Sequence, residues 1–429
     1  MKMKTNLPRI LIVGTLPYNP QESSRALDTY FRGFPKENLR MIFSNVNTPI
    51  KGHCESLFQI TDKEMAKKFF KRKMHVGRVF NYDQLPDQVQ KSEDKSFVGK
   101  FKKKNSLRYY ARKVLWGHNR WLTKELEEWV DEFKPEAIYV CFSDDYFILD
   151  ITRYFSKKYN LPVICQISDD YYFIKESFAL KSYYKKYRKL VDEIMSTEGF
   201  AFYISDKISD KYNSYFKKKG FPIYLGSDIE NNKNPEIKFE FNYFGKINVG
   251  RYKSLALLNN ALKAINPEFK VNVFTDEFDS KRGKYLIKNN CSVYKPIPYT
   301  EVKKKLCEGS FNIIASGFDE KDVDLTKYSV STKVADCLKS KTPLIAIGSK
   351  DDGAIDYLLK EDCAIVLSDK NINIEDLATK LNNLEYLKKN IKNAYALYER
   401  NHEFAVNNTR FLEECSKLRK EESKWITLC

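Results

Sequence analysis

The feature that most constrains the fold of this chain is a regular alternation of short apolar runs with longer amphipathic stretches, present in both halves. The predicted strands are residues 9–14, 135–141, 161–167, 203–205, 270–274 and 311–316, and the predicted helices include 121–133, 255–265, 300–307 and 391–418. Strands that alternate with helices favour parallel, doubly wound sheets. Because 429 residues fit two domains of ordinary size, we expect an α/β chain with two Rossmann-like domains.

The segment 329–348 carries the most specific chemistry. It predicts a short helix capped by Ser329 or Ser331, then a break at Pro343 and an apolar strand. The first backbone N–H groups of such a helix, around Thr332, have no partner within the helix. A helix start of this kind can bind phosphate.

Lys333 and Asp336 stand three positions apart and so share one face of this helix. A cation for a diphosphate beside a carboxylate for ribose hydroxyls suits a nucleotide-sugar site, although such charge pairs are also common on ordinary helices. With Pro343 seven residues after Asp336, the spacing resembles the donor-site signature of GT-B glycosyltransferases of family 4 (group 1). That family has Glu where this chain has Asp336, and a second Glu at the position of Tyr328.

The resemblance implies a GT-B fold, in which two Rossmann-like, doubly wound parallel-sheet domains face a cleft. It assigns 1–226 to the acceptor side, 237–390 to nucleotide-sugar binding, and 391–429 to helices that cross back to the first domain. It also implies no bound cofactor, no required metal, and retention at the anomeric carbon. Tyr328 lacks the family's carboxylate and leaves the stereochemistry open.

A second stretch, 242–255, resembles the family's first strand and loop of the nucleotide domain. There Gly245 would let the backbone approach the donor closely, and Lys246 would bind its phosphates. Arg251 or Lys253 would supply a second cation. The resemblance therefore implies that this loop grips the diphosphate of a UDP- or GDP-sugar.

The first half offers a candidate loop on the acceptor side. Gly14 ends the first predicted strand, without the Gly-x-Gly-x-x-Gly of a dinucleotide site. Ser23, Ser24 and Arg25 open the next helix, where the family's first loop approaches the acceptor and the donor sugar. A helix cap is the alternative interpretation of the two serines.

Asp169 and Asp170 follow the predicted strand 161–167. Ligands of doubly wound sheets gather at the carboxyl ends of strands, so these carboxylates are the candidate catalytic groups, as a general base or as ligands of acceptor hydroxyls. The alternative is an ordinary turn at the end of a strand, where Asp is favoured. Asp144 and Asp145 have the same local form with less support.

Other site chemistries find little support. Asp322 and Asp324 have the Asp-x-Asp spacing of some metal sites, but they lie late in the chain in an acidic loop. The four histidines are not at ligand spacing, and the nine cysteines include no Cys-x-x-Cys pair, as expected of reduced thiols in the cytoplasm. No apolar stretch approaches the length of about 18 residues that a membrane span needs.

Positive charge is the second strong signal, with a formal net charge of +17. Basic residues interleaved with aromatic ones occur in the first half at 67–73, 100–104, 108–113 and 181–189. Such a face suits an anionic membrane surface or a lipid-linked pyrophosphate, and we expect no nucleic-acid partner. An AT-rich genome would give a similar composition without selection for binding. Residues 83–105 are predicted to form a loop.

Together these features predict a cytoplasmic glycosyltransferase of the hexosyltransferase type, peripheral to the inner face of the membrane. It would move a sugar from a UDP- or GDP-sugar to a glycan or lipid-linked acceptor in bacterial surface polysaccharide or glycoconjugate synthesis. One alternative is a non-hydrolysing nucleotide-sugar epimerase, which needs no acceptor. The other is a non-catalytic GT-B-like scaffold of a glycan assembly complex, which the departures at Tyr328 and Asp336 keep open.

Overall fold

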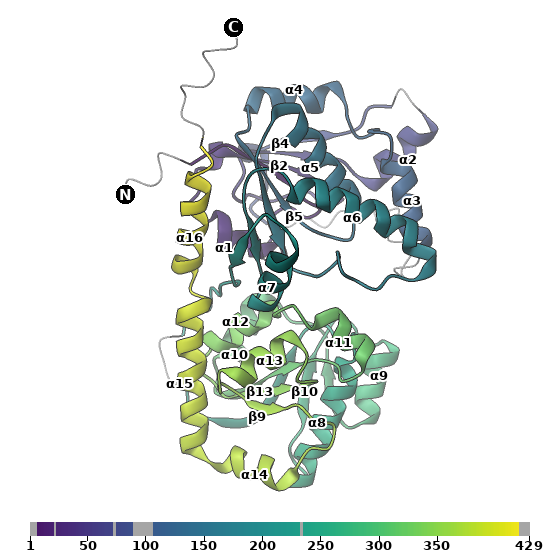
Figure 1. Ribbon diagram of the computed structural model, residues 1–429. Helices are drawn as coiled ribbons and strands as arrows, with labels where there is room; N and C mark the ends of the chain where they lie inside the picture. The colour runs from purple at the N-terminus through teal and green to yellow at the C-terminus, as the bar shows by residue number, and fades with distance from the viewer. Residues whose placement is uncertain (1–6, 21–22, 72–73, 89–105, 232–234, 420–429) are drawn as a thin grey trace. The chain divides into compact units, whose positions relative to one another are not determined.

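The computed structural model describes residues 7–20, 23–71, 74–88, 106–231 and 235–419, and the chain divides into two compact units (Figure 1). The first unit comprises Met1–Ile223 with Asn408–Cys429, and the second comprises Tyr224–Asn407. Most of the predicted loop 83–105 lies outside the described residues.

The first unit is built on an eight-stranded sheet in the order β4-β3-β2-β1-β5-β6-β7-β8. All neighbouring strands are parallel except β3 and β4. The central β1 is buried along its whole length, as expected of a parallel strand covered on both faces. The strands are β1 (Ile10–Val13), β2 (Leu39–Phe43), β3 (Ser56–Gln59), β4 (Arg78–Asn81), β5 (Ala137–Cys141), β6 (Val163–Ile167), β7 (Ala201–Tyr203) and β8 (Gly220–Pro222).

Helices alternate with these strands along the chain. They are α1 (Leu27–Phe31), α2 (Asp62–Phe70), α3 (Ser106–Trp116), α4 (Lys124–Phe133), α5 (Tyr146–Tyr159), α6 (Lys181–Met195) and α7 (Asp206–Tyr215). The predicted helix 121–133 was three residues too long at its start. Trp121 is fully buried ahead of the helix, and Thr123 caps it by accepting a hydrogen bond from the Leu126 N–H.

The second unit is built on a six-stranded sheet in the order β11-β10-β9-β12-β13-β14, and every neighbouring pair is parallel. Its strands are β9 (Lys238–Phe244), β10 (Val271–Phe274), β11 (Ser292–Tyr294), β12 (Ser310–Ala315), β13 (Leu344–Ile347) and β14 (Ile365–Leu367). The strand order reverses direction between β9 and β12, which is where doubly wound sheets bind ligands.

Helices cover both faces of this sheet (Figure 1). The helices are α8 (Arg251–Ile265), α9 (Lys281–Lys288), α10 (Tyr299–Leu306), α11 (Glu320–Thr326), α12 (Thr332–Lys339), α13 (Gly353–Lys360), α14 (Ile374–Asn382) and α15 (Leu384–Asn401). Alternate residues of one strand serve opposite faces: Ile313 packs with α8 and α9, whereas Ile314 packs with α12 and α13. The predicted parallel α/β architecture is thus confirmed for both units.

The end of the chain is not the single helix that 391–418 predicted. It forms α15 and then α16 (Phe404–Ser416), with a break at His402. Next to the break, the His402 Nδ1 donates to the carbonyl of Leu225 at 2.9 Å, and the Asn407 amide donates to the carbonyl of Tyr224 at 2.8 Å. These contacts with a distant segment fix the break, and a helical pattern in the sequence does not record them.

The rest of α16 belongs to the first unit. The side-chain amide of Asn408 donates to the carbonyl of Tyr30 at 2.9 Å, and the ring of Phe411 packs against Phe31 and Phe202. Within the described residues, none of the helices combines the length and the apolar character required to cross a membrane.

Candidate functional site

The start of α12 is shaped by its own sequence. Ser331 has an extended conformation, and its side-chain oxygen accepts a hydrogen bond from the backbone N–H of Lys333. Ser331, rather than Ser329, is therefore the cap. The first turn of this helix contains no acidic side chain, so its partial positive charge is not offset from within the turn.

Lys333 extends from this first turn to the loop that follows β9. Its Nζ lies 3.5 Å from the hydroxyl of Tyr243 and 4.8 Å from the centre of that ring. The ammonium group occupies the space where a Cβ atom at Gly245 would stand. Gly245 has a φ of +131°, a conformation that glycine alone adopts readily. Two predicted donor residues from distant parts of the sequence are thus brought together.

Lys246 follows Gly245 in this loop and is exposed. Its carbonyl accepts a hydrogen bond from the hydroxyl of Tyr243 at 2.5 Å, which ties the loop to the end of β9. Among the residues that the structure describes, no carboxylate lies within ion-pair distance of the ammonium of Lys246 or Lys333. Lys333 and Lys246 therefore place two positive charges next to Gly245 without a neutralising carboxylate among the described residues, and this arrangement attracts an anion.

Arg251 opens α8 and braces the same loop. Its Nε donates to the carbonyl of Ala315 at the end of β12 at 3.2 Å, and its Nη1 donates to the Asn248 side chain at 3.0 Å. Val249 and Gly250 before it have φ values of +51° and +71°. Positive φ is strained for a β-branched residue, and such strain is commonly found at functional sites.

Asp336 lies one turn further along α12 and is 3 % exposed. Both of its carboxylate oxygens lie 3.1 Å from the hydroxyl of Tyr299 at the start of α10. The same hydroxyl lies 3.1 Å from Asp228, which in turn pairs with Lys303 at 2.8 Å. The predicted ribose ligand is therefore a buried carboxylate that shares one phenolic donor with a second carboxylate.

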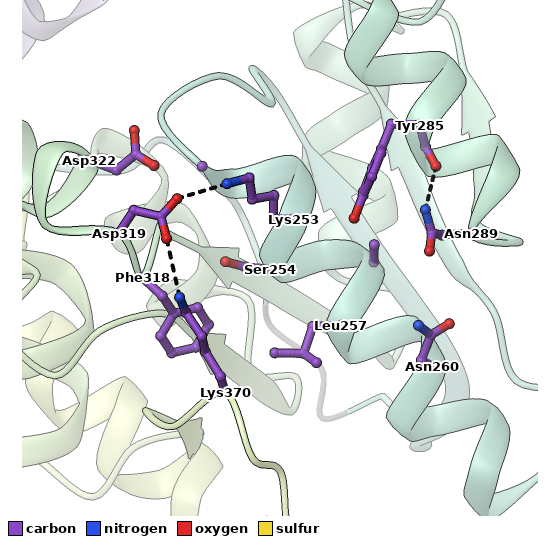
Figure 2. A pocket seen from close by; sticks show the side chains of 12 residues that line it. Lys253, Ser254, Leu257, Asn260, Tyr285, Asn289, Phe318, Asp319, Asp322 and Lys370 are labelled. Atoms are coloured by element: carbon purple, nitrogen blue, oxygen red, sulfur yellow. Dashed lines mark hydrogen bonds and ion pairs between the residues drawn. The ribbon is translucent and has the colours of Figure 1, made fainter.

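Lys253, the other candidate for the second cation, has different surroundings. Its Nζ pairs with Asp319 at 2.8 Å, and it lines a pocket between α8 and α9 (Figure 2). The pocket does not include Lys246, Lys333 or Asp336. Of the two alternatives, Arg251 is therefore the one braced against the loop of Gly245.

The segment with the Asp-x-Asp spacing was predicted to be an acidic loop, but it forms the helix α11. Asp322 and Asp324 both lie on α11, where Asp324 pairs with Lys327 at 2.6 Å. The side chain of Asp322 packs against Gly250 and Gly317. In the described parts of the chain, no group of three or more His, Cys, Asp or Glu side chains could hold a metal ion.

On the first unit, the loop after β1 holds the predicted acceptor-side residues. The N–H of Gly14 donates to the carbonyl of Ile42 at 3.0 Å. Ser23, Ser24 and Arg25 lie in a 3-10 helix, Ser23–Ala26. The Ser24 hydroxyl is buried, and within the described part of the chain no group bonds to it.

Asp169 and Asp170 follow β6, as predicted, but they differ in environment. Asp170 is engaged within its own unit: its oxygens accept from Lys211 at 2.7 Å, from the Tyr212 hydroxyl at 3.1 Å and from the Phe173 N–H at 3.1 Å. Asp169 is exposed, and its carboxylate lies 3.4 Å from the hydroxyl of Tyr171. Asp169 is thus the more accessible of the two carboxylates.

Asp145 belongs to a buried ionic cluster with Arg112 and Asp62. The guanidinium of Arg112 bonds Asp62 at 2.7 Å and also pairs with Asp145, and the indole N–H of Trp116 donates to Asp62 at 2.8 Å. Burial raises the pKa of Asp145, although Arg112 acts in the opposite direction. The cluster connects α2, α3 and the residue that precedes α5. Neighbouring Asp144 accepts from the Tyr109 hydroxyl at 2.7 Å.

Among the described residues, the aromatic side chains of the basic runs in the first half do not all face solvent. Tyr109, Tyr183 and Tyr184 are buried, which contradicts their predicted role as membrane-facing side chains. Amphipathic helices place such tyrosines inward while lysines between them face solvent. Phe70 on α2 is 81 % exposed and Phe178 is 94 % exposed. The run at 100–104 lies outside the described residues.

Sequence reasoning missed Tyr243, Tyr299 and Asp228. Tyr243 reads as an ordinary strand residue, and Asp228 falls in a segment that looked like a polar linker. The parallel pairing of β9, β10 and β11 brings Tyr243 and the segment that leads from β11 to Tyr299 to one edge of the sheet. Asp228 comes from the segment before β9 and meets Tyr299 through its side chain. The eight cysteines among the described residues are all free thiols.

No protein-family model matches this sequence, and no curated protein matches it. Solved structures do match its fold. Sucrose-phosphate synthase from Thermosynechococcus elongatus has a TM-score of 0.60 at 9% identity, covering 96% of this chain and 99% of that one. The UDP-forming trehalose-phosphate synthase from Burkholderia vietnamiensis has a TM-score of 0.59 at 9% identity, covering 96% of this chain and 97% of that one. Anabaena HepE in complex with UDP has a TM-score of 0.59 at 11% identity, covering 95% of this chain and 100% of that one.

The chain has the GT-B fold. This result confirms the fold that the segments 242–255 and 329–348 implied. At identities of 9–11% the likeness extends to the fold alone.

Proposed function

We propose that this protein is a glycosyltransferase that moves a sugar from a nucleotide-sugar donor to an acceptor. The observation that carries the proposal is the convergence of Lys333, from the start of α12, with Gly245 and Lys246 after β9. It places two cations without carboxylate partners in the described chain beside a helix N-terminus. This is the chemistry that binds a diphosphate.

The comparisons support a nucleotide diphosphate as the ligand. The structure of HepE was determined with UDP, and separately with UDP and glucose, and the Burkholderia synthase is described as UDP-forming. We therefore take UDP as the first nucleotide to test and GDP as the second. Membership of family 4 (group 1), retention at the anomeric carbon, and a role in surface polysaccharide synthesis belong to the same proposal.

In the proposed reaction the bond between the anomeric carbon and the diphosphate breaks, and the diphosphate leaves with the bonding electron pair. An acceptor hydroxyl oxygen bonds to that carbon and gives its proton to a carboxylate on the acceptor side. Lys246, Lys333 and Arg251 would stabilise the negative charge that develops on the diphosphate. The N–H groups at the start of α12, near Thr332, would add to that charge stabilisation. Asp336 would accept hydrogen bonds from the ribose hydroxyls. We assign acceptor handling to Asp169 before Asp170, since Asp169 is exposed whereas Asp170 is partly buried.

The acceptor is proposed to be a glycan or a lipid-linked glycan, and α2 is the surface proposed to meet an anionic membrane. Phe69 and Phe70 at the end of this helix are exposed, and Lys67, Lys68 and Lys71 stand beside them. Apolar rings flanked by lysines suit the interface of an anionic bilayer. We place the protein in the cytoplasm at the inner face of the membrane on this basis.

The test is a thermal-shift and calorimetry screen of the full chain against UDP, GDP, CMP and ADP, with Lys333→Ala alongside. Lys388→Ala is the matched control, because Lys388 is an exposed helical lysine of the same unit, on α15. We expect one nucleotide to bind, with binding lost in Lys333→Ala and kept in Lys388→Ala. Folded protein that binds none of the four would reject the donor site and favour a scaffold role.

A second assay separates transfer from epimerisation. The nucleotide sugar whose nucleotide binds is incubated with the protein and no acceptor, and the sugar is analysed by NMR. An epimer of the donor would identify an epimerase. Release of nucleotide that depends on an added glycan acceptor would support glycosyl transfer.

A further inference from the structure

A pocket of about 280 Å³ opens on the second unit between α8, α9 and the segment that joins β12 to α11 (Figure 2). Lys253 and Leu257 line it from α8, Tyr285 from α9, and Asp319 from the joining segment. Its volume lies near the lower end of the range for small-molecule sites, about 300–1,000 Å³. A ligand of the size of one or two sugar units fits such a space.

The charged groups of the pocket balance one another. The carboxylate of Asp319 accepts hydrogen bonds from Lys253 at 2.8 Å and from Lys370 at 3.2 Å, and Asp322 adds a second carboxylate to the lining. A diphosphate would have to displace Asp319 from both lysines and would then face two carboxylates. A cation would meet the two ammonium groups. The balance therefore favours an uncharged ligand.

The remaining lining groups combine apolar and polar surface. The ring of Tyr285 extends from α9 toward α8 and is 42 % exposed, and Phe318 and Leu257 add further apolar surface (Figure 2). Asn260 and Asn289 contribute side-chain amides to the rim. A purely apolar ligand would take these polar and charged groups out of water without offering them hydrogen bonds.

A saccharide matches this combination of groups. Its hydroxyls both donate and accept hydrogen bonds, and they can therefore use carboxylates, ammonium groups and amides together. The C–H face of a sugar ring can pack on an aromatic ring such as that of Tyr285. We propose that this pocket binds a neutral saccharide unit of a glycan, as a second carbohydrate site apart from the donor site.

The proposal goes beyond the proposed transfer reaction and can fail independently of it. None of Lys246, Lys333 and Asp336 lines the pocket. Gly250 does line it and precedes Arg251, so the two sites share one loop. A glycan held here would keep a polymeric substrate on the enzyme while its reacting end lies elsewhere, which raises its effective concentration.

The experiment uses the folded full chain on an array of neutral oligosaccharides built from hexoses and N-acetylhexosamines, followed by calorimetric titration of the glycan that binds best. The test variants are Tyr285→Ala and Asp319→Asn. The matched controls lie in the same unit outside the pocket. Tyr294→Ala removes a tyrosine that is 46 % exposed, and Lys389→Met breaks the ion pair of Lys389 with Asp362 at 2.7 Å.

We expect each test variant to weaken glycan binding about tenfold, the equivalent of one charge-assisted hydrogen bond or aromatic contact, and each control to bind as the original chain does. The proposal would be overturned if the protein bound no neutral glycan on the array. It would also be overturned if Tyr285→Ala bound the selected glycan with unchanged affinity. Binding of inorganic phosphate that Lys370→Met abolishes would also overturn it, in favour of an anion site. Glycan binding that persists in Lys333→Ala, alongside loss of nucleotide binding, would establish that the two sites are separate.

Discussion

Replacing Gly245 by Ala tests the convergence that carries the proposed function. An added Cβ would stand where the ammonium of Lys333 now lies, and the φ of +131° disfavours any side chain. Backbone strain of this kind costs about 1–3 kcal/mol. For a unit of this size that loss lowers the melting temperature by roughly 2–12 °C. If Lys333 binds the phosphate as proposed, its displacement removes one charge-assisted hydrogen bond and should weaken nucleotide binding by about 10–150-fold.

The assay combines thermal unfolding with calorimetric titration of the nucleotide that the screen identifies. The double variant Gly245→Ala with Lys333→Ala separates the two causes. The end of the flexible Lys333 side chain can move aside at little cost, whereas the backbone strain stays, so the double variant should recover little of the stability that Gly245→Ala loses. It should recover none of the nucleotide affinity, because the cation is then absent.

Two results would refute this reasoning. A Gly245→Ala protein that melts at the original temperature and binds the nucleotide unchanged would mean that Lys333 and the loop do not meet as described. A double variant less stable than either single variant would mean that Lys333 stabilises the unit by another contact. Non-additive effects at this one place are expected, since the two residues touch.

Three further perturbations have defined outcomes. Arg112→Met should lower the free energy of unfolding by about 3–5 kcal/mol, measured by urea denaturation, because Asp62 and Asp145 would lose their buried counter-ion. Tyr299→Phe should lower the free energy of unfolding by about 1–3 kcal/mol in the same measurement, because it removes the hydroxyl that bonds Asp228 and Asp336. Burial lowers the pKa of His402 from 6.5 to about 4. The unfolded chain takes up a proton on this ring below pH 6.5, but the folded chain does so only near pH 4. The free energy of unfolding should therefore fall by about 3 kcal/mol between pH 6.5 and pH 4, and by less in His402→Gln.

The sequence was sufficient to predict the architecture because the signals for it are local. Apolar runs of four to six residues that alternate with helices along the chain favour parallel strands, and Ser331 caps α12 as its residue type suggests. Two errors in the bounds of helices depended on tertiary contacts. The start of α4 depends on buried Trp121, and the break at His402 depends on carbonyl groups of a segment far away in the chain.

The candidate site could be predicted only in part, because helix geometry decides whether two side chains that are close in sequence point to the same side of the helix. Arg251 and Lys253 are two positions apart, which turns them about 200° from each other around α8. One braces the loop after β9, and the other pairs with Asp319 in the pocket. No pattern in the sequence says which face of α8 meets β12, since Leu and Ala occur around much of the helix.

Net charge alone would have pointed to the basic runs of the first half rather than to the loop at Gly245. The chain carries a formal charge of +17, yet many of its cations already face a carboxylate, as Lys253 does at Asp319 and Arg112 does at Asp62. An anion that binds such a cation must displace a partner, and the exchange gains little free energy. Lys246 and Lys333 have no carboxylate partner within the described chain, so a diphosphate would bind them without displacing one. The local imbalance of charge therefore favours the loop at Gly245 over the more basic runs of the first half as the anion site.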